Sequence, residues 1–274
     1  MKDAANCARQ TKVFAEAVKN VDSSVRLVGC TYWGDWNKPL LEQAGKLLNY
    51  FSYHDYMLDS YKPEDMQVSA KAFTQYLRLK PQKFHQELRL PMTRDEWNTT
   101  WGRPGTLGMG LYAAGVLNLL CREAEAPGVE QAYFFQPVSA GAIKVTPLTA
   151  EIDTAGKVFA AFKVHQGNRS LKLPEMPADA DLGVCASAQA DGHRVYATIV
   201  NRSTTKDHTL ELLAKNMARP AKASAKFLIA RDVTQQQADF DEREEKPTVT
   251  EDSRLVVKVP RYSVAVIELT NGDE

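Results

Sequence analysis

The sequence lacks any pair of closely spaced cysteines. Its four cysteines are Cys7, Cys30, Cys121 and Cys185, and no two of them form a C-x-x-C motif. Such wide spacing fits neither a zinc site nor a disulfide framework, so we expect buried free thiols. The five histidines show no metal-ligand spacing either, and we therefore expect no metal site.

The chain also has no excess of either charge and no long hydrophobic run. Lys+Arg and Asp+Glu each number 34 in 274 residues, so the composition indicates neither a nucleic-acid partner nor disorder. The most apolar stretch, Gly105 to Cys121, includes four glycines and is shorter than the ~20 apolar residues of a membrane span. It predicts a buried helix. Residues 1–7 contain no apolar run typical of a signal peptide, and the compartment stays undetermined.

Helical and strand patterns alternate over the first 170 residues. Apolar residues at helical spacing predict helices, and short β-branched or aromatic runs predict strands. Helices are expected at 5–20, 39–48, 65–79, 106–124 and 153–164, and strands at 25–30, 50–56, 87–94 and 131–138. This alternation is typical of βαβ units with a parallel sheet. Four such units are half of a (β/α)₈ barrel, which needs eight strands and about 250 residues.

The pattern changes near residue 171. Residues 171–182 contain two prolines and no periodicity, which predicts a linker. Beyond it, apolar and polar residues alternate, and Asp191-Gly192 is a strong hairpin signal. Several short strands separated by polar turns indicate an antiparallel β-sandwich at residues 183–274. The charged segment 235–251 is expected to be a solvated loop.

Polar and aromatic residues recur where the predicted parallel strands end. They are Tyr32, Trp33, Asp35, Trp36, His54, Asp55, Tyr56, Asp95, Glu96, Trp97, Asn98 and Gln136. The C-terminal ends of barrel strands carry function in nearly all barrel enzymes, and carboxylates, amides and aromatic faces together suit a sugar site. Taken singly, an Asp-Glu pair is usually solvated, and a lone histidine or tryptophan is usually structural. Their recurrence at successive strand ends favours a site.

The run Asp95-Glu96-Trp97-Asn98 after an apolar strand resembles the nucleophile motif of the glycoside hydrolase family 51 α-L-arabinofuranosidases. Residues 21–30 and 52–56 are similar to the family's fifth and sixth barrel strands, and 260–269 to the last strand of its C-terminal sandwich. The resemblance covers nearly the whole chain. It implies an α/β plus all-β protein, with the C-terminal half of a (β/α)₈ TIM barrel (strands five to eight) at residues 1–170, followed by the linker and an antiparallel β-sandwich.

The resemblance implies a retaining hydrolase that acts on arabinose-containing oligo- or polysaccharides without a cofactor. In such enzymes one carboxylate attacks the anomeric carbon, while a second protonates the leaving oxygen from ~5–5.5 Å away. Glu96 matches the nucleophile, which must stay ionised with help from donors or positive charge such as Arg94 or Asn98. The implied substrate-binding residues are His54, Tyr56, Trp97, Asn98, Trp101 and Gln136. Among these, His54 and Tyr56 would orient Glu96 or the sugar, and Gln136 would bind a hydroxyl.

The acid/base glutamate of the family follows an asparagine at the end of the fourth strand, and this chain has no match to that motif. Three explanations stay open: a fragment of a longer protein that is inactive alone, which we favour, a chain that pairs with a separate N-terminal half, or a non-catalytic remnant. The apolar face and strand edges of half a barrel also favour self-association. Asp35 and Asp55 are the local candidates for a replacement acid. Two other functions stay open: a non-catalytic carbohydrate-binding or assembly module, and a related barrel glycosidase acting on another sugar.

Overall fold

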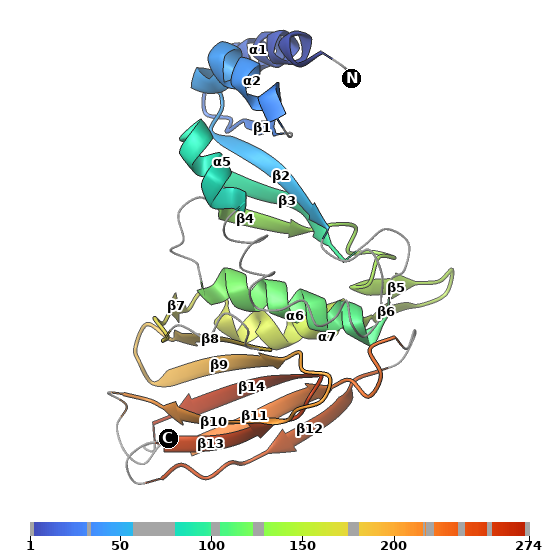
Figure 1. Ribbon diagram of the computed structural model, residues 1–274, viewed down its shortest axis with the longest axis vertical. Helices are drawn as coiled ribbons and strands as arrows, with labels where there is room; N and C mark the ends of the chain where they lie inside the picture. Colours follow the sequence, from blue (N-terminus) through green and yellow to red (C-terminus); the bar gives the residue numbers. More distant parts are fainter. Residues whose placement is uncertain are drawn as a thin grey trace. The chain divides into compact units, whose positions relative to one another are not determined.

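The computed structural model describes residues 3–31, 34–56, 80–99, 105–122, 129–174, 181–215, 217, 222–234, 239–250 and 254–271. Contacts between residues group the chain into two compact units, which are considered separately here. Unit 1 comprises Met1–Tyr56, Gln75–Asn98 and Ala126–Phe135; unit 2 comprises Met57–Thr74, Thr99–Glu125 and Gln136–Glu274. The chain is a mixed α/β protein (Figure 1). The domain boundaries expected from the sequence stay a prediction.

Unit 1 is built on a four-stranded parallel sheet. The strands lie side by side in chain order: β1 (Val28–Cys30), β2 (Tyr50–Tyr56), β3 (Met92–Asn98) and β4 (Val129–Phe134). All three neighbouring pairs are parallel, which confirms the parallel sheet predicted from the sequence. Its helical elements are α1 (Ala4–Val21), η1 (Gly34–Trp36), α2 (Asn37–Ala44), η2 (Gly45–Leu47) and α5 (Lys80–Leu88).

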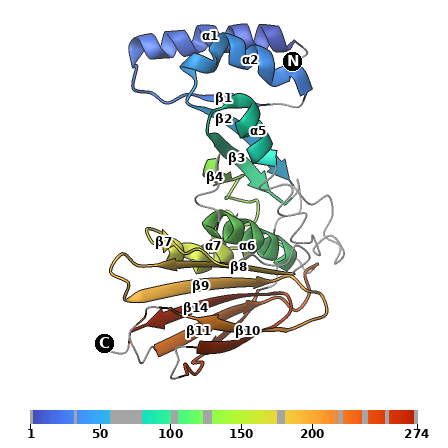
Figure 2. The ribbon, with the colours of Figure 1, turned by 60° about the vertical axis from the view of Figure 1, so that its left-hand side comes forward.

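Helices of unit 1 share one core with one face of this sheet. Helices α1 and α2 pack together (Figure 2). Buried residues of α1, α2 and α5 form one cluster with Phe51 and Tyr53 of β2 and Met92 of β3. Successive side chains of a strand point to opposite faces. Since Phe51 and Tyr53 face the helices, His54 and Tyr56 at the end of β2 point to the opposite face of the sheet.

The strand expected at residues 87–94 is wrong in position. Residues Lys80–Leu88 form α5, and β3 begins only at Met92. Phe84 and Leu88, four residues apart, are both buried, a helical spacing that the sequence reading missed. Arg89 then adopts a φ of 55°, a left-handed conformation typical of a helix end. The helix expected at 65–79 lies outside the described residues.

The described part of unit 2 combines helical elements with antiparallel sheets. The helical elements are α6 (Leu107–Arg122), α7 (Thr154–Phe162) and η4 (Lys163–His165). A six-stranded sheet has the order β12 (Asp241–Glu245), β11 (Lys222–Ile229), β14 (Ser263–Thr270), β9 (Arg194–Asn201), β8 (Leu182–Ala188) and β7 (Arg169–Ser170). Two further pairs are β10 (His208–Leu213) with β13 (Arg254–Val259), and β5 (Ile143–Val145) with β6 (Ala150–Ile152). No helix in the described ranges is long and apolar enough to cross a membrane.

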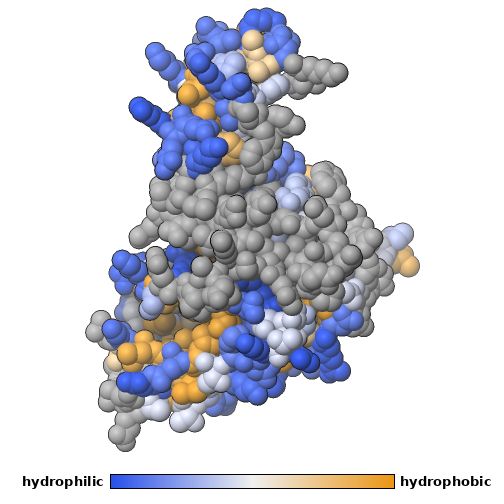
Figure 3. Space-filling model, in the orientation of Figure 1, coloured by the Kyte–Doolittle hydropathy of each residue, from blue (hydrophilic) through white to orange (hydrophobic). Residues whose placement is uncertain are grey.

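One apolar core is shared by the six-stranded sheet and the β10–β13 pair. It includes Ile199 of β9, Phe227 of β11, Val257 of β13 and Ile267 of β14. The hairpin predicted at Asp191-Gly192 is confirmed, because it joins β8 to β9 and Gly192 has a φ of 73°. Figure 3 shows hydrophobic and hydrophilic side chains intermingled on the surface over these antiparallel strands.

The solvated loop expected at 235–251 is wrong for its middle part. Residues Asp241–Glu245 form β12, an exposed strand paired with β11. Its charged side chains meet opposite charges across the pair, as between Lys226 Nζ and Glu244 Oε1 at 2.8 Å. Charged residues on an edge strand discourage pairing with another chain. High charge alone therefore did not distinguish a loop from an edge strand.

A buried histidine joins η4 to the six-stranded sheet. His165 is 9% exposed, and its Nδ1 and Nε2 each lie 2.7 Å from a hydroxyl oxygen, Ser187 Oγ and Thr198 Oγ1. Burial lowers the pKa of His165 to about 4. The imidazole is therefore neutral at pH 7 and is held by two hydroxyl groups.

The shared core predicts a strong contrast between two adjacent valines of β13. Val257 is 3% exposed and Val256 is 55% exposed. We expect Val257→Ala to lower the free energy of unfolding by about 2–3 kcal/mol through lost burial and a cavity. Val256→Ala is the matched control, expected within about 0.5 kcal/mol of the wild type. Urea unfolding measures both; equal losses in the two variants would contradict this core.

The buried imidazole predicts a stability loss in mild acid. Between pH 6.5, the ordinary pKa, and pH 4, the unfolded chain binds a proton at His165 that the folded chain does not bind. The free energy of unfolding therefore falls as the pH is lowered through this window, by up to about 3 kcal/mol. His165→Gln should flatten this dependence, whereas His193→Gln, at an exposed hairpin, should not. Denaturant unfolding at several pH values checks this, and an unchanged slope in His165→Gln would refute it.

Candidate functional site

The end of β3 carries an extra residue relative to β2. Ser52 pairs with Thr93, and His54 pairs with Glu96. Two steps along β2 thus correspond to three steps along β3. Such a β-bulge bends the strand and redirects its side chains, and bulges are frequent beside active sites.

The pairing of β3 with β4 locates the same irregularity. Arg94 pairs with Ala132 and Trp97 with Phe134, again three steps on β3 against two on its neighbour. The first shift lies between Thr93 and Glu96 and the second between Arg94 and Trp97, so the two shifts share only the stretch around Asp95. The bulge therefore belongs to β3 itself and falls inside the Asp-Glu-Trp-Asn motif.

Three side chains converge beside this bulge. The Tyr56 hydroxyl donates a hydrogen bond to Glu96 Oε2 at 3.0 Å, and His54 Nδ1 lies 3.2 Å from the same oxygen. The other ring nitrogen of His54 lies 3.5 Å from Asp95 Oδ1, an oxygen that accepts no hydrogen bond from the described residues. His54 therefore stands between the two carboxylates and is closer to Glu96.

The site is half-open to solvent. The Glu96 side chain is 28% exposed and that of His54 is 44% exposed. Burial raises the pKa of the Tyr56 phenol, and the hydrogen bond to Glu96 and its negative charge raise that pKa further. Tyr56 therefore keeps its proton throughout the neutral range and remains a donor to Glu96.

Arg94 and Asn98, expected to help keep Glu96 ionised, make contacts with neighbouring strands. Arg94 is 1% exposed, and its Nε donates to Tyr53 Oη at 3.1 Å. The Asn98 amide donates from Nδ2 to the carbonyl oxygen of Phe135 at 3.1 Å. These contacts fix the two side chains; their expected effect on Glu96 stays a prediction.

The other predicted binding residues are Trp97, Trp101 and Gln136. Trp97 is 1% exposed, and its ring meets the Phe134 ring edge-on with centroids 5.0 Å apart, which favours a packing role. Trp101 lies outside the described residues. Gln136 is exposed, has a φ of 49° and belongs to unit 2. The substrate-binding roles of all three stay predictions.

The replacement-acid role considered for two aspartates stays a prediction. Asp35 is exposed in η1. Asp55 lies in β2, but its side chain is outside the described part of the structure, as are Tyr32 and Trp33. Trp36 is half-buried at the end of η1.

Sequence reasoning missed two residues beside the cluster. Cys30 is exposed, but partial desolvation of its thiol raises the pKa, and the charges of Asp95 and Glu96 add to this, which places the thiol in the field of both carboxylates. The Phe135 ring meets the Tyr56 ring edge-on, with centroids 6.0 Å apart. Because Cys30 is the last residue of β1, the strand-end rule that selected Glu96 also selects Cys30.

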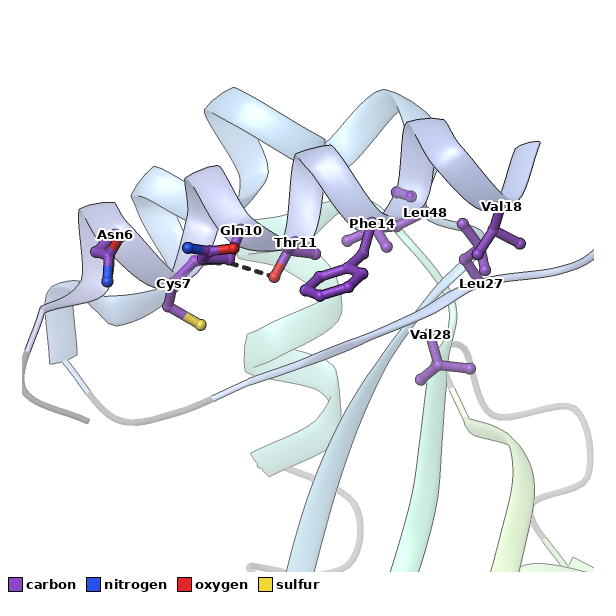
Figure 4. Close-up of a pocket in the computed structure, with 10 residues that line it drawn as sticks. Asn6, Cys7, Gln10, Thr11, Phe14, Val18, Leu27, Val28 and Leu48 are labelled. Carbon is purple, nitrogen blue, oxygen red and sulfur yellow. Dashed lines mark hydrogen bonds between the residues drawn. The ribbon is translucent and has the colours of Figure 1, made fainter. Parts of the chain in front are cut away.

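A separate groove of about 440 Å³ lies on unit 1 between α1 and the segment around β1 (Figure 4). Phe14 and Val18 of α1 border it together with Leu27 and Val28. The lining includes the thiol of Cys7 but no carboxylate or imidazole. The groove therefore has no acid or base beside that thiol, and the Glu96 cluster is the candidate site.

The arrangement holds one carboxylate in a defined orientation. One oxygen of Glu96 is engaged by the Tyr56 phenol and the His54 imidazole, and the Phe135 ring packs against the Tyr56 ring. Within the described ranges, no group of three or more His, Cys, Asp or Glu residues is arranged to hold a metal ion.

No family model matches the sequence, and no curated protein matches it either. Solved structures do match the fold. An α-L-arabinofuranosidase from Thermotoga maritima, solved with arabinose, has a TM-score of 0.80 at 22% identity over 98% of this chain. The family 51 arabinofuranosidase from Xanthomonas axonopodis pv. citri has a TM-score of 0.73 at 17% identity over 98% of this chain.

Structures from another glycosidase family are also similar. A family 44 endoglucanase from Clostridium acetobutylium has a TM-score of 0.69 at 12% identity over 98% of this chain. The chain spans only about 62% of the length of the Thermotoga enzyme. Its fold is thus that of the C-terminal part of the family 51 α-L-arabinofuranosidases.

Proposed function

We propose that this chain carries the nucleophile side of a retaining α-L-arabinofuranosidase site, with Glu96 as the nucleophile. In this proposal the parallel sheet is the second half of a (β/α)₈ barrel within residues 1–170. A linker at 171–182 and a β-sandwich at 183–274 follow. The likeness to family 51 enzymes over 98% of the chain supports the arrangement.

The observation that carries the proposal is the convergence on one oxygen of Glu96. Both the Tyr56 hydroxyl and His54 Nδ1 meet Oε2. These contacts restrict the rotation of the carboxylate, so that Oε1 is presented to a sugar. A retaining mechanism requires a carboxylate in a fixed position, because it forms a bond to the anomeric carbon.

The substrate in this proposal is a terminal arabinofuranosyl residue of a plant-type oligo- or polysaccharide. The Thermotoga relative was solved in complex with arabinose, which supports sugar binding at the equivalent fold. Proton donation to the leaving oxygen needs a second carboxyl group ~5–5.5 Å away. The proposal assigns that group to no residue of this chain, so turnover of substrates with poor leaving groups by this chain alone is expected to be negligible.

A second candidate is a related glycosidase that acts on β-linked glucan or xylan. It is favoured by the TM-scores of 0.69 with the family 44 endoglucanase and 0.68 with a bifunctional glucanase-xylanase. Both candidates use a carboxylate nucleophile. Parallel assays with aryl arabinofuranosides, aryl cellobiosides and aryl xylobiosides distinguish them by which sugar reacts.

The proposed nucleophile predicts a covalent adduct with an activated substrate. Dinitrophenolate leaves without protonation, so 2,4-dinitrophenyl 2-deoxy-2-fluoro-α-L-arabinofuranoside does not need the acid residue. We expect one fluorosugar to become attached to the peptide that contains Glu96, as seen by mass spectrometry. Glu96→Gln should abolish this labelling.

Glu130→Gln is the matched control. Glu130 lies on β4 of the same sheet and accepts a hydrogen bond from the Tyr50 hydroxyl at 2.9 Å, away from the Glu96 cluster. Labelling should persist in that variant. An adduct on another residue, or no adduct with any of the activated glycosides, would overturn the assignment of Glu96.

The hydrogen bond from Tyr56 predicts a slower reaction when its hydroxyl is removed. A hydrogen bond to a charged group contributes about 1.5–3 kcal/mol, so Tyr56→Phe should lower the second-order labelling rate by about 10–100-fold. Tyr133→Phe removes the exposed hydroxyl that donates to Gln131 on β4 and should leave the rate unchanged. Because the pKa of Tyr56 is raised, the wild-type rate should show no loss through phenol ionisation up to pH 10. Equal rates for Tyr56→Phe and the wild type would contradict the role of Tyr56.

A further inference from the structure

Helix α6 lies across strand β8 in a register that brings two cysteines together. Asn118 of α6 stands over Gly183 of β8: a Cβ atom added to Gly183 would lie 3.0 Å from Asn118 Oδ1. The Asn118 side chain also donates from Nδ2 to the carbonyl oxygen of Thr198 at 2.8 Å. These contacts determine which residue of the helix lies over which residue of the strand.

The same register extends to the next positions. Cys121 follows Asn118 by three residues, so the two side chains share one helix face. Cys185 follows Gly183 by two residues, so both point to the same face of β8. The step from Asn118 to Cys121 covers about 5 Å along the helix, and the step from Gly183 to Cys185 covers about 7 Å along the strand. Cys121 therefore lies over Cys185.

The side chains confirm this contact and give the two thiols different surroundings. Cys185 is fully buried, and its Sγ lies 3.6 Å from Nε2 of His165. Cys121 is partly exposed. A hydrogen bond between the thiols lowers the pKa of Cys121, while that contact and burial raise the pKa of Cys185.

We propose that Cys121 and Cys185 form a reversible oxidation site, at which a hydroperoxide converts the two thiols to a disulfide between α6 and β8. The sulfur of Cys121, the more accessible of the two, attacks a peroxide oxygen. The O–O bond breaks, giving a sulfenic acid and one water when the oxidant is hydrogen peroxide. The sulfur of Cys185 then attacks the sulfur of Cys121, the S–O bond breaks, and a second water leaves with the remaining thiol proton.

This chemistry matches the surroundings of each thiol. Thiols with thiolate character and solvent access are oxidised first, and a neighbouring thiol resolves the sulfenic acid. Nε2 of His165 contacts Cys185 Sγ and helps to hold this side chain in place. The cross-link closes a loop of roughly 60 residues, which stabilises the folded state mainly by restricting the unfolded chain. This site is independent of the proposed glycosidase activity.

The test is oxidation of the whole native chain by hydrogen peroxide, followed by counting of free thiols under denaturing conditions. We expect two of the four thiols to be lost and recovered with dithiothreitol. Peptide mapping should find Cys121 joined to Cys185. The melting temperature of the oxidised protein should rise by about 5–10 °C.

The other two cysteines provide the control. Cys7→Ser/Cys30→Ser should keep the cross-link and the temperature shift, whereas Cys121→Ser should lose both. Peptide mapping uses the wild-type protein, so the cross-link can be tested even if a cysteine variant fails to fold. Two results would overturn the proposal. In one, Cys121 and Cys185 stay reduced under conditions that oxidise the exposed Cys30; in the other, either cysteine forms a disulfide with a different partner.

Discussion

The candidate site depends on one extra residue in β3. In a regular strand, consecutive side chains point to opposite faces, and Asp95 and Glu96 would be separated by the sheet. The bulge shown by the registers on both sides of β3 breaks that alternation. Both carboxylates then reach the ring of His54, one at each nitrogen. The bulge therefore converts a strand end into a cluster of interacting polar groups.

Strand β2 holds this cluster by dividing its side chains between two tasks. Phe51 and Tyr53 are buried in the core beneath the helices of unit 1, which restricts movement of the strand. Farther along, His54 and Tyr56 meet Glu96. A site supported by a packed strand keeps its geometry better than one on a loop. The Tyr53 hydroxyl also accepts a hydrogen bond from the buried Arg94 of β3, which ties the two strands together.

The sequence was sufficient for the features that depend on local pattern. Strand β2 lies at the predicted residues, Tyr50–Tyr56, and the strand-end rule selected His54, Tyr56 and Glu96 together. It could not reveal the bulge, because a bulge is defined by pairing with strands some forty residues away. Helix α5 was missed for a different reason: the apolar residues around Leu88 fit either a helix end or a strand start, and only burial decides.

The contact between Cys121 and Cys185 could not be predicted from the sequence, because cysteine spacing rules detect only cysteines that are close together along the chain. Cys121 and Cys185 are brought together by a contact that involves neither of them. Gly183 has no side chain, so Asn118 can approach the backbone of β8 and reach the carbonyl of Thr198. A Cβ atom at position 183 would come within 3.0 Å of Asn118 Oδ1, so that the asparagine side chain would have to shift. The contact between the two cysteines therefore depends on a glycine and an asparagine. The prediction of buried free thiols is right for Cys185 and wrong for Cys30, which is exposed, while Cys7 and Cys121 are partly exposed.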